Sequence, residues 1–282
     1  MEHIKGLGIP YMGSKRKLAP KIVDKILEDN PKCKYFYDLF GGGGAISFEA
    51  SQRIDNVYYN EFDTGITELL QKIKKEGITE EFYKWIDRET FFEMKEGKCW
   101  EGGFIKTCWS FGNNGNSYMY SKNIEEENIT VNEARLKQQR IFTTTLNDKE
   151  KKELKEKIGC IVEGGNVRVI SQHLERIQHL QKLKDYINFN ISNLSYEKVE
   201  INTPVEETII YLDPPYQNTY QYQNDIDHEK LWEWVRNCPY KVYISSYEAP
   251  FEEVLSMEHR TTVAQKANNK VVEKLFVNKP LQ

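Results

Sequence analysis

Residues 209–216 read Ile-Ile-Tyr-Leu-Asp-Pro-Pro-Tyr. The first four are apolar and include residues favoured in strands, which predicts a short buried β-strand. Pro214 and Pro215 lack a backbone N–H, so the strand has to end before them. Ligands of an open α/β sheet bind at the carboxyl ends of its strands, where we expect Asp213 and Tyr216. A carboxylate, two carbonyls without competing N–H groups and an aromatic ring suit a flat group that bears an amino substituent. The alternative is a plain turn that closes a strand.

A second apolar strand, predicted from residue 35, runs into four consecutive glycines at residues 41–44 and then into a helix. Glycines let the backbone take positive φ and approach a ligand closely. The dinucleotide fingerprint requires a third Gly or Ala where this chain has Ile46. A phosphate-binding loop would require Gly-Lys-Ser/Thr, which does not follow. Nicotinamide dinucleotides and nucleoside triphosphates are therefore poor candidates for the ligand of this turn.

A third strand, predicted from residue 57, ends in Glu61, which lies 23 residues after Asp38. A carboxylate at the tip of the second strand of such a unit typically accepts hydrogen bonds from ribose hydroxyls, with a spacing of about 20 residues. We expect Glu61 to have this role, and Asp63 is the nearby substitute. The alternative for both acids is a cap on the following helix.

The composition is that of an ordinary folded protein. The chain has 282 residues, of which 39% are hydrophobic and 29% charged. No apolar run approaches the roughly 20 residues that span a bilayer, and the N-terminus has no secretory signal. Five scattered cysteines form neither a disulfide framework nor a zinc site, so we expect a cytoplasmic protein without a metal. A net charge of −4 weighs mildly against nucleic-acid binding, although a local cluster of basic residues can override it.

The tetrapeptide at residues 213–216 resembles the catalytic motif of the amino methyltransferases, which transfer a methyl group from S-adenosyl-L-methionine to an exocyclic nitrogen. The glycine turn is similar to the cofactor motif of these enzymes. The resemblance implies that Asp38, Phe40, Gly42 and Gly44 bind the cofactor together with Glu61. Asp213 would border the cofactor as well as the substrate.

Residues 10–18, Pro-Tyr-Met-Gly-Ser-Lys-Arg-Lys-Leu, precede a helical pattern. This stretch is similar to the N-terminal motif of the Dam-type DNA adenine methyltransferases. By that resemblance Tyr11 and Lys15 line the cofactor site, because an aromatic face suits a sulfonium cation and an ammonium suits a carboxylate. Arg16 and Lys17 would face DNA phosphates. A solvated basic turn is the alternative.

The resemblance implies an α/β fold, with a Rossmann-like methyltransferase core that carries an inserted, mainly helical target-recognition lobe. The core would comprise residues 1–66 and 168–282, and the lobe residues 67–167. Within the lobe, residues 109–118 interleave Gly, Asn and Ser with aromatic residues, which is typical of an irregular loop. Arginine reads guanine and glutamine reads adenine in the major groove. By chemistry alone, the candidate base-reading residues are Arg135, Lys137, Gln138, Gln139 and Arg140.

The implied function is site-specific methylation of N6 of a flipped-out adenine in double-stranded DNA, as in restriction–modification systems. Asp213 and the Pro214 carbonyl would accept hydrogen bonds from the adenine amino group, Pro215 would keep the turn rigid, and Tyr216 would stack on the base. Two alternatives stay open. One is the same cofactor chemistry on RNA or on a protein glutamine, and the other is a catalytically silent DNA-binding module. The recognised DNA sequence and the oligomeric state stay undetermined.

Overall fold

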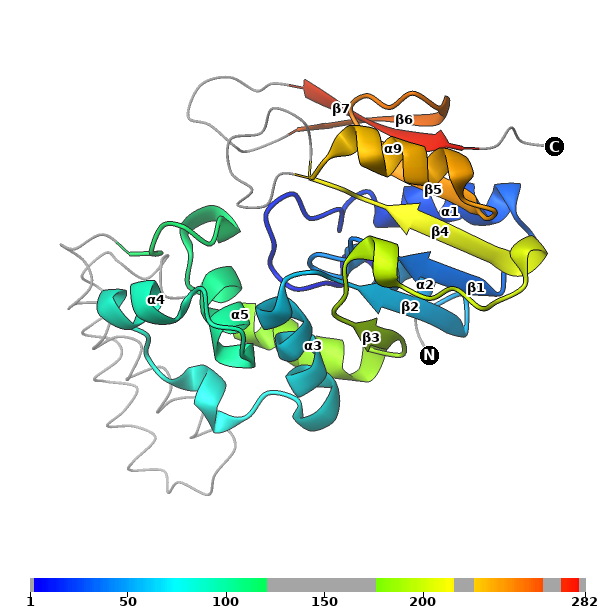
Figure 1. The fold of residues 1–282 in the computed structure, drawn as a ribbon. Helices are drawn as coiled ribbons and strands as arrows, with labels where there is room; N and C mark the ends of the chain where they lie inside the picture. Colours follow the sequence, from blue (N-terminus) through cyan, green and yellow to red (C-terminus); the bar gives the residue numbers. More distant parts are fainter. Residues whose placement is uncertain (1–2, 121–175, 216–225, 261–269, 279–282) are drawn as a thin grey trace.

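The computed structural model describes residues 3–120, 176–215, 226–260 and 270–278, and its centre is a seven-stranded sheet (Figure 1). The strands are β1 (Tyr35–Asp38), β2 (Asn56–Asn60), β3 (Asn190–Ser192), β4 (Thr208–Leu212), β5 (Lys241–Ser246), β6 (Glu252–Arg260) and β7 (Lys270–Val277). The sheet order is β3-β2-β1-β4-β5-β7-β6. The strands predicted from residue 35, from residue 57 and at 209–212 are all present.

Strands β1 to β5 pair in parallel, whereas β7 lies antiparallel to both β5 and β6. The chain builds outward from β1 through β2 to β3 and then returns to place β4 on the other side of β1. The strand order therefore reverses between β1 and β4, and such a reversal leaves a crevice at the carboxyl ends of the two strands. This architecture confirms the expected Rossmann-like α/β core. Edge strand β6 is not foreseen from the sequence, because exposed acids such as Glu252 and Glu253 interrupt its apolar pattern.

Alternating residues of the central strands pack into two hydrophobic layers, one on each face of the sheet. Ile209 and Tyr211 of β4 join the layer on the face of helices α1 (Ala19–Asp29) and α2 (Ala45–Ala50). Ile210 and Leu212 join the layer under helix α9 (His228–Asn237) on the opposite face (Figure 1). All five residues of β4 are buried, as expected for a strand that is covered on both faces. The strand that carries Asp213 is thus held by packing on both sides.

Three further helices extend the first layer: α3 (Thr64–Glu76), α4 (Arg88–Met94) and α5 (Trp100–Cys108). Residues 176–183 are also helical. Short 3-10 helices are η1 (Glu80–Tyr83), η2 (Phe111–Asn113), η4 (Lys184–Tyr186), η5 (Tyr196–Lys198) and η6 (Val205–Glu207). In the part of the chain that the structure describes, no helix combines the length and the apolar character needed to cross a membrane.

The predicted boundary between core and inserted lobe, at residues 66 and 67, falls inside α3. Buried residues of the predicted lobe, such as Phe82, Phe91 and Phe104, share one hydrophobic cluster with the sheet. Residues 121–167 lie outside the described part of the chain. The division into a core and a lobe therefore stays a prediction, but its first boundary does not coincide with a break in the packing.

Candidate active site

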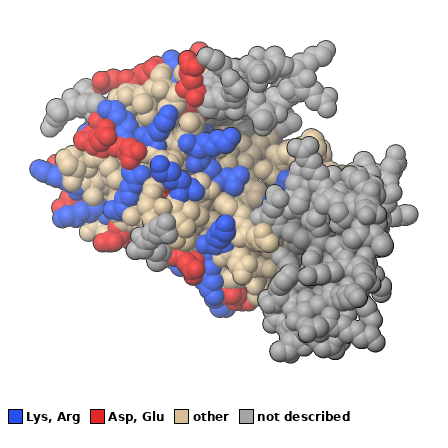
Figure 2. Space-filling model, turned by 180° about the vertical axis from the view of Figure 1, so that it is seen from behind, with Lys and Arg blue, Asp and Glu red and all other residues tan. Residues whose placement is uncertain are grey.

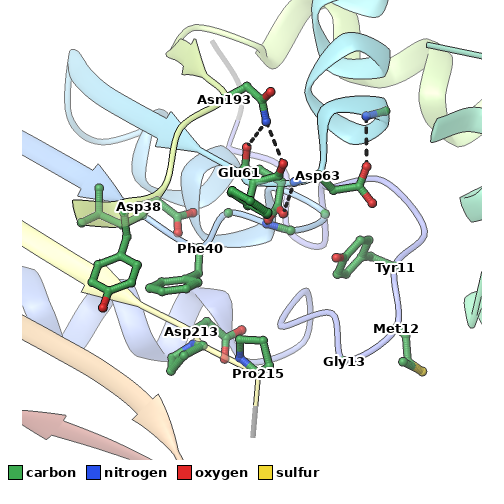
Figure 3. A pocket seen from close by; sticks show the side chains of 18 of the residues that line it. Tyr11, Met12, Gly13, Asp38, Phe40, Glu61, Asp63, Asn193, Asp213 and Pro215 are labelled. Atoms are coloured by element: carbon green, nitrogen blue, oxygen red, sulfur yellow. Dashed lines mark hydrogen bonds between the residues drawn. The ribbon is translucent and has the colours of Figure 1, made fainter. Parts of the chain in front are cut away.

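A cavity of about 890 Å³ lies at the carboxyl ends of β1, β2, β3 and β4, where the strand order reverses. The predicted site residues that line it are Tyr11, Lys15, Asp38, Phe40, Gly42, Glu61, Asp213, Pro214 and Pro215. Figure 3 shows Asp38, Phe40 and Asp213 on one side of the view and Tyr11 on the other, with Glu61 toward the top. Residues that are far apart in sequence thus surround one space, because each follows a parallel strand or belongs to the N-terminal segment beside them.

Two predicted site residues are not among those that line the cavity. Gly44 takes a positive φ of 77° and caps the N-terminus of α2, so it turns the chain from the glycine loop into the helix. Tyr216 lies outside the described residues, as do the candidate base-reading residues at 135–140. Their predicted roles stay untested.

The glycine turn is tied to the end of β2. The Gly42 N–H donates to Glu61 Oε2 at 2.7 Å, and the Asp63 N–H donates to Glu61 Oε1 at 2.9 Å. The Tyr59 hydroxyl donates to the Gly42 carbonyl at 2.7 Å. Burial raises the pKa of Glu61, although these N–H groups oppose the shift. Glu61 is therefore a preorganised acceptor in the cavity wall.

Asp63 has a different role in the structure. Its carboxylate accepts from the Gly65 and Ile66 N–H groups and so caps α3, and it lies 2.7 Å from Lys106 Nζ. These contacts match the helix-cap alternative, and they leave Glu61 as the better candidate for binding ribose.

Asp38 is the most buried carboxylate of the cavity wall, at 1% exposure. Its Oδ2 accepts from the Ser47 hydroxyl at 2.7 Å, whereas Oδ1 has no hydrogen-bond partner among the described residues. Burial raises the pKa of Asp38 to about 7, and the negative charges of Asp213 and Glu61 add to the effect. A cationic ligand next to Oδ1 would favour the ionised form and satisfy the acceptor. The cavity is thus suited to a ligand that carries positive charge.

Lys15 lines the cavity, but its ammonium group pairs with a carboxylate of the protein. Lys15 Nζ lies 2.8 Å from Asp213 Oδ1, and the lysine is only 6% exposed. The Lys15 carbonyl accepts from the Leu18 and Ala19 N–H groups at 2.7 Å, which fixes the backbone of Lys15 at the start of α1. The resemblance implied that this ammonium would meet a carboxylate of the cofactor, and the structure pairs it with Asp213.

Several residues of the cavity wall were not predicted. Phe62 is 62% exposed although it is a large apolar residue, and it lines the cavity next to Glu61. Asn193 donates to the carbonyls of Glu61 and Phe62 at 2.7 and 2.9 Å and so holds this strand end in place (Figure 3). Residues 113–116 of the Asn- and Gly-rich loop also line the cavity. An aromatic residue directly after the strand-end acid was a usable signal for Phe62, but Asn193 has no local signal.

The predicted phosphate contacts differ in exposure. Lys17 is exposed, whereas Arg16 is half-buried with Nη1 3.3 Å from His179 Nε2. On the face shown in Figure 2, Lys and Arg side chains are interspersed with Asp and Glu side chains, so this face carries both signs of charge. The DNA contacts of Arg16 and Lys17 stay predictions.

Comparison with known proteins finds a matching family model. A family model described as "D12 class N6 adenine-specific DNA methyltransferase" matches residues 11–269. A search of curated proteins finds no match. The matched segment includes the N-terminal turn, the glycine turn, the end of β2 and the Asp-Pro-Pro turn. It thus contains every predicted site residue.

Proposed function

The chain belongs to the D12 class of N6 adenine-specific DNA methyltransferases, and from this membership we propose that it takes its methyl group from S-adenosyl-L-methionine and delivers it to adenine in the cavity at the β1–β4 reversal. The observation that carries the proposal is that Asp213 and the glycine turn line one cavity. Methyl transfer requires two bound molecules whose reacting atoms are adjacent, and such proximity lowers the barrier strongly.

The cavity wall fits the methyl donor. When bound, S-adenosyl-L-methionine supplies an electrophilic methyl group on a positively charged sulfonium. Oδ1 of Asp38, which has no hydrogen-bond partner among the described residues, would hold the α-ammonium group, and Glu61 would accept hydrogen bonds from the ribose hydroxyls. Phe62 would lie against the adenine ring of the cofactor, and the ring of Tyr11 would face the cation. These assignments use the buried Asp38, whose Oδ1 has no partner among the described residues, and the exposed ring of Phe62.

The Asp-Pro-Pro turn would act on the adenine amino group. The lone pair of this group is delocalised into the ring, which makes it a poor nucleophile. Hydrogen bonds from the two amino hydrogens to the Asp213 carboxylate and the Pro214 carbonyl would free the lone pair and direct it toward the methyl group. Tyr216 would stack on the base. An adenine inside a duplex cannot reach this turn, so the enzyme has to flip it out, at a cost of a few kcal/mol. In this proposal the lobe at residues 67–167 recognises the double-stranded DNA sequence around the target adenine.

The proposed function is tested by incubating the purified protein with methyl-labelled S-adenosyl-L-methionine and, separately, with duplex DNA, RNA and a protein extract. We expect label in DNA, recovered as N6-methyladenine within one short sequence. Label in RNA or in protein but not in DNA would refute the proposal, and so would methylation of cytosine. Sequencing of modified positions would then identify the recognised sequence.

Glu61→Gln is expected to weaken binding of S-adenosyl-L-methionine about 10- to 100-fold, because a hydrogen bond to a charged group contributes roughly 1.5–3 kcal/mol. The amide retains one acceptor for the glycine turn but presents an NH2 group in place of the second oxygen. Isothermal titration calorimetry measures the change. Glu68→Gln is the matched control, because Glu68 is exposed on α3 and does not line the cavity. Equal affinities in the two variants would exclude Glu61 from the donor site.

A further inference from the structure

A buried ion-pair network joins the Asp-Pro-Pro turn to a strand on the far side of β5. Lys15 Nζ lies 2.8 Å from Asp213 Oδ1 and 3.7 Å from Glu273 Oε1. The Glu273 side chain is 2% exposed, and Glu273 does not line the cavity. An acid this deeply buried is costly unless its charge is compensated, and the Lys15 ammonium compensates it here. Neither the sequence motifs nor the proposed chemistry accounts for Glu273.

The elements that carry the three charges are rigid relative to one another. Glu273 belongs to β7, which pairs with β5 through Ser245↔Leu275 and Ser246↔Lys274. Strand β5 in turn pairs with β4, which leads directly into Asp213. Lys15 reaches this sheet from the turn before α1. Its long side chain loses rotamer entropy when it is ordered, so a single partner holds it less firmly than two.

We propose that Glu273 is a positioning residue for methyl transfer, which acts on Asp213 through Lys15; the inference rests on the proposed function. An ammonium group has three donors and can serve two carboxylates at once. Sharing the Lys15 charge with Glu273 keeps the ammonium at one place and so holds the Asp213 carboxylate in one orientation. It also leaves Asp213 with more negative charge than a one-to-one ion pair would, which strengthens its hydrogen bond from the amino group. Glu273 itself touches neither the methyl donor nor the base.

Single-turnover methyl transfer to duplex DNA, at saturating donor and DNA, tests this role. Glu273→Gln is expected to lower the rate about 10- to 100-fold, because small misplacements of a reacting group have effects of this size. The dissociation constants for S-adenosyl-L-methionine and DNA are expected to stay within about twofold of wild type, because Glu273 is outside the cavity. Glu252→Gln, the same substitution at an exposed position of β6, is the control and is expected to retain the wild-type rate.

The outcomes separate the explanations. A folded Glu273→Gln enzyme with a wild-type rate would overturn the inference, and a lowered melting temperature with an unchanged rate would show a purely structural role. If Glu273→Gln fails to fold, the same rate is measured for Glu273→Asp. This variant keeps the negative charge, but its shorter side chain places the carboxylate farther from Lys15. In a Lys15→Met background, the further change Glu273→Gln is expected to have no additional effect on the rate, and an additive loss would contradict action through Lys15. An inactive wild-type enzyme would instead refute the proposed function.

Discussion

Asp213→Asn is expected to lower methyl transfer to DNA by about 10²–10³-fold or more, which is the typical effect of removing one preorganised hydrogen-bonding group from an active site. The substitution conserves shape, and the amide oxygen can still accept from Lys15. It removes the negative charge that would strengthen the hydrogen bond from the adenine amino group. It also replaces one acceptor oxygen with an NH2 group, which can only donate. Because β4 is buried on both faces and the amide keeps an acceptor for Lys15, we expect the variant to fold.

The measurement is the single-turnover rate, together with the circular dichroism spectrum and the melting temperature of the variant. Asp185→Asn is the matched control, because Asp185 is exposed and does not line the cavity. A folded Asp213→Asn enzyme that keeps its rate within a few-fold of wild type would remove Asp213 from the mechanism. The proposed chemistry would then have to rest on the Pro214 carbonyl alone.

Gly103→Ala is expected to be the most destabilising of the substitutions considered. A Cβ atom at Gly103 in α5 would lie 2.0 Å from the carbonyl oxygen of Gly65 in α3. This oxygen belongs to the backbone, so the two helices have to move apart. Overpacking of this kind costs typically 1–3 kcal/mol, occasionally more. We expect a loss at the upper end of this range or beyond, because no flexible side chain can give way.

The free energy of unfolding, from denaturant titration, measures the effect. Gly112→Ala is an informative comparison, because Gly112 has a φ of +61° and a Cβ there would meet nothing within 4 Å. That variant should lose only the roughly 1–2 kcal/mol of a left-handed backbone conformation. If Gly103→Ala costs no more than Gly112→Ala, the close contact between α3 and α5 does not limit stability.

Much of the site follows from the sequence. Residues 209–212 are apolar and are followed by two prolines, so a buried strand has to end at Asp213. The same reasoning places the glycine turn after β1 and Glu61 after β2. Because parallel strands present their carboxyl ends at one edge of a sheet, three separate local patterns predict one shared site. The family membership, the methyltransferase core and adenine methylation of DNA were anticipated from the resemblance of these motifs to those of the Dam-type methyltransferases.

Other features depend on contacts between segments that no local pattern connects. Lys15 and Asp213 are 198 residues apart, and only the assembled sheet brings the ammonium to the carboxylate rather than leaving it for a ligand. Glu273 belongs to this network because β7 lies between β5 and β6 in the sheet. This strand order was not predicted from the sequence. The choice between Glu61 and Asp63 also required the structure, since both acids follow the same strand and only their hydrogen-bond partners distinguish them.

The sequence by itself therefore determined which residues stand at strand ends, because apolar periodicity, glycine and proline act on the backbone within a few residues. The tertiary structure decided which charged side chains pair, such as Lys15 with Asp213 and Glu273. The energy of a buried ion pair depends on distance and burial, and the chain acquires both only when it folds.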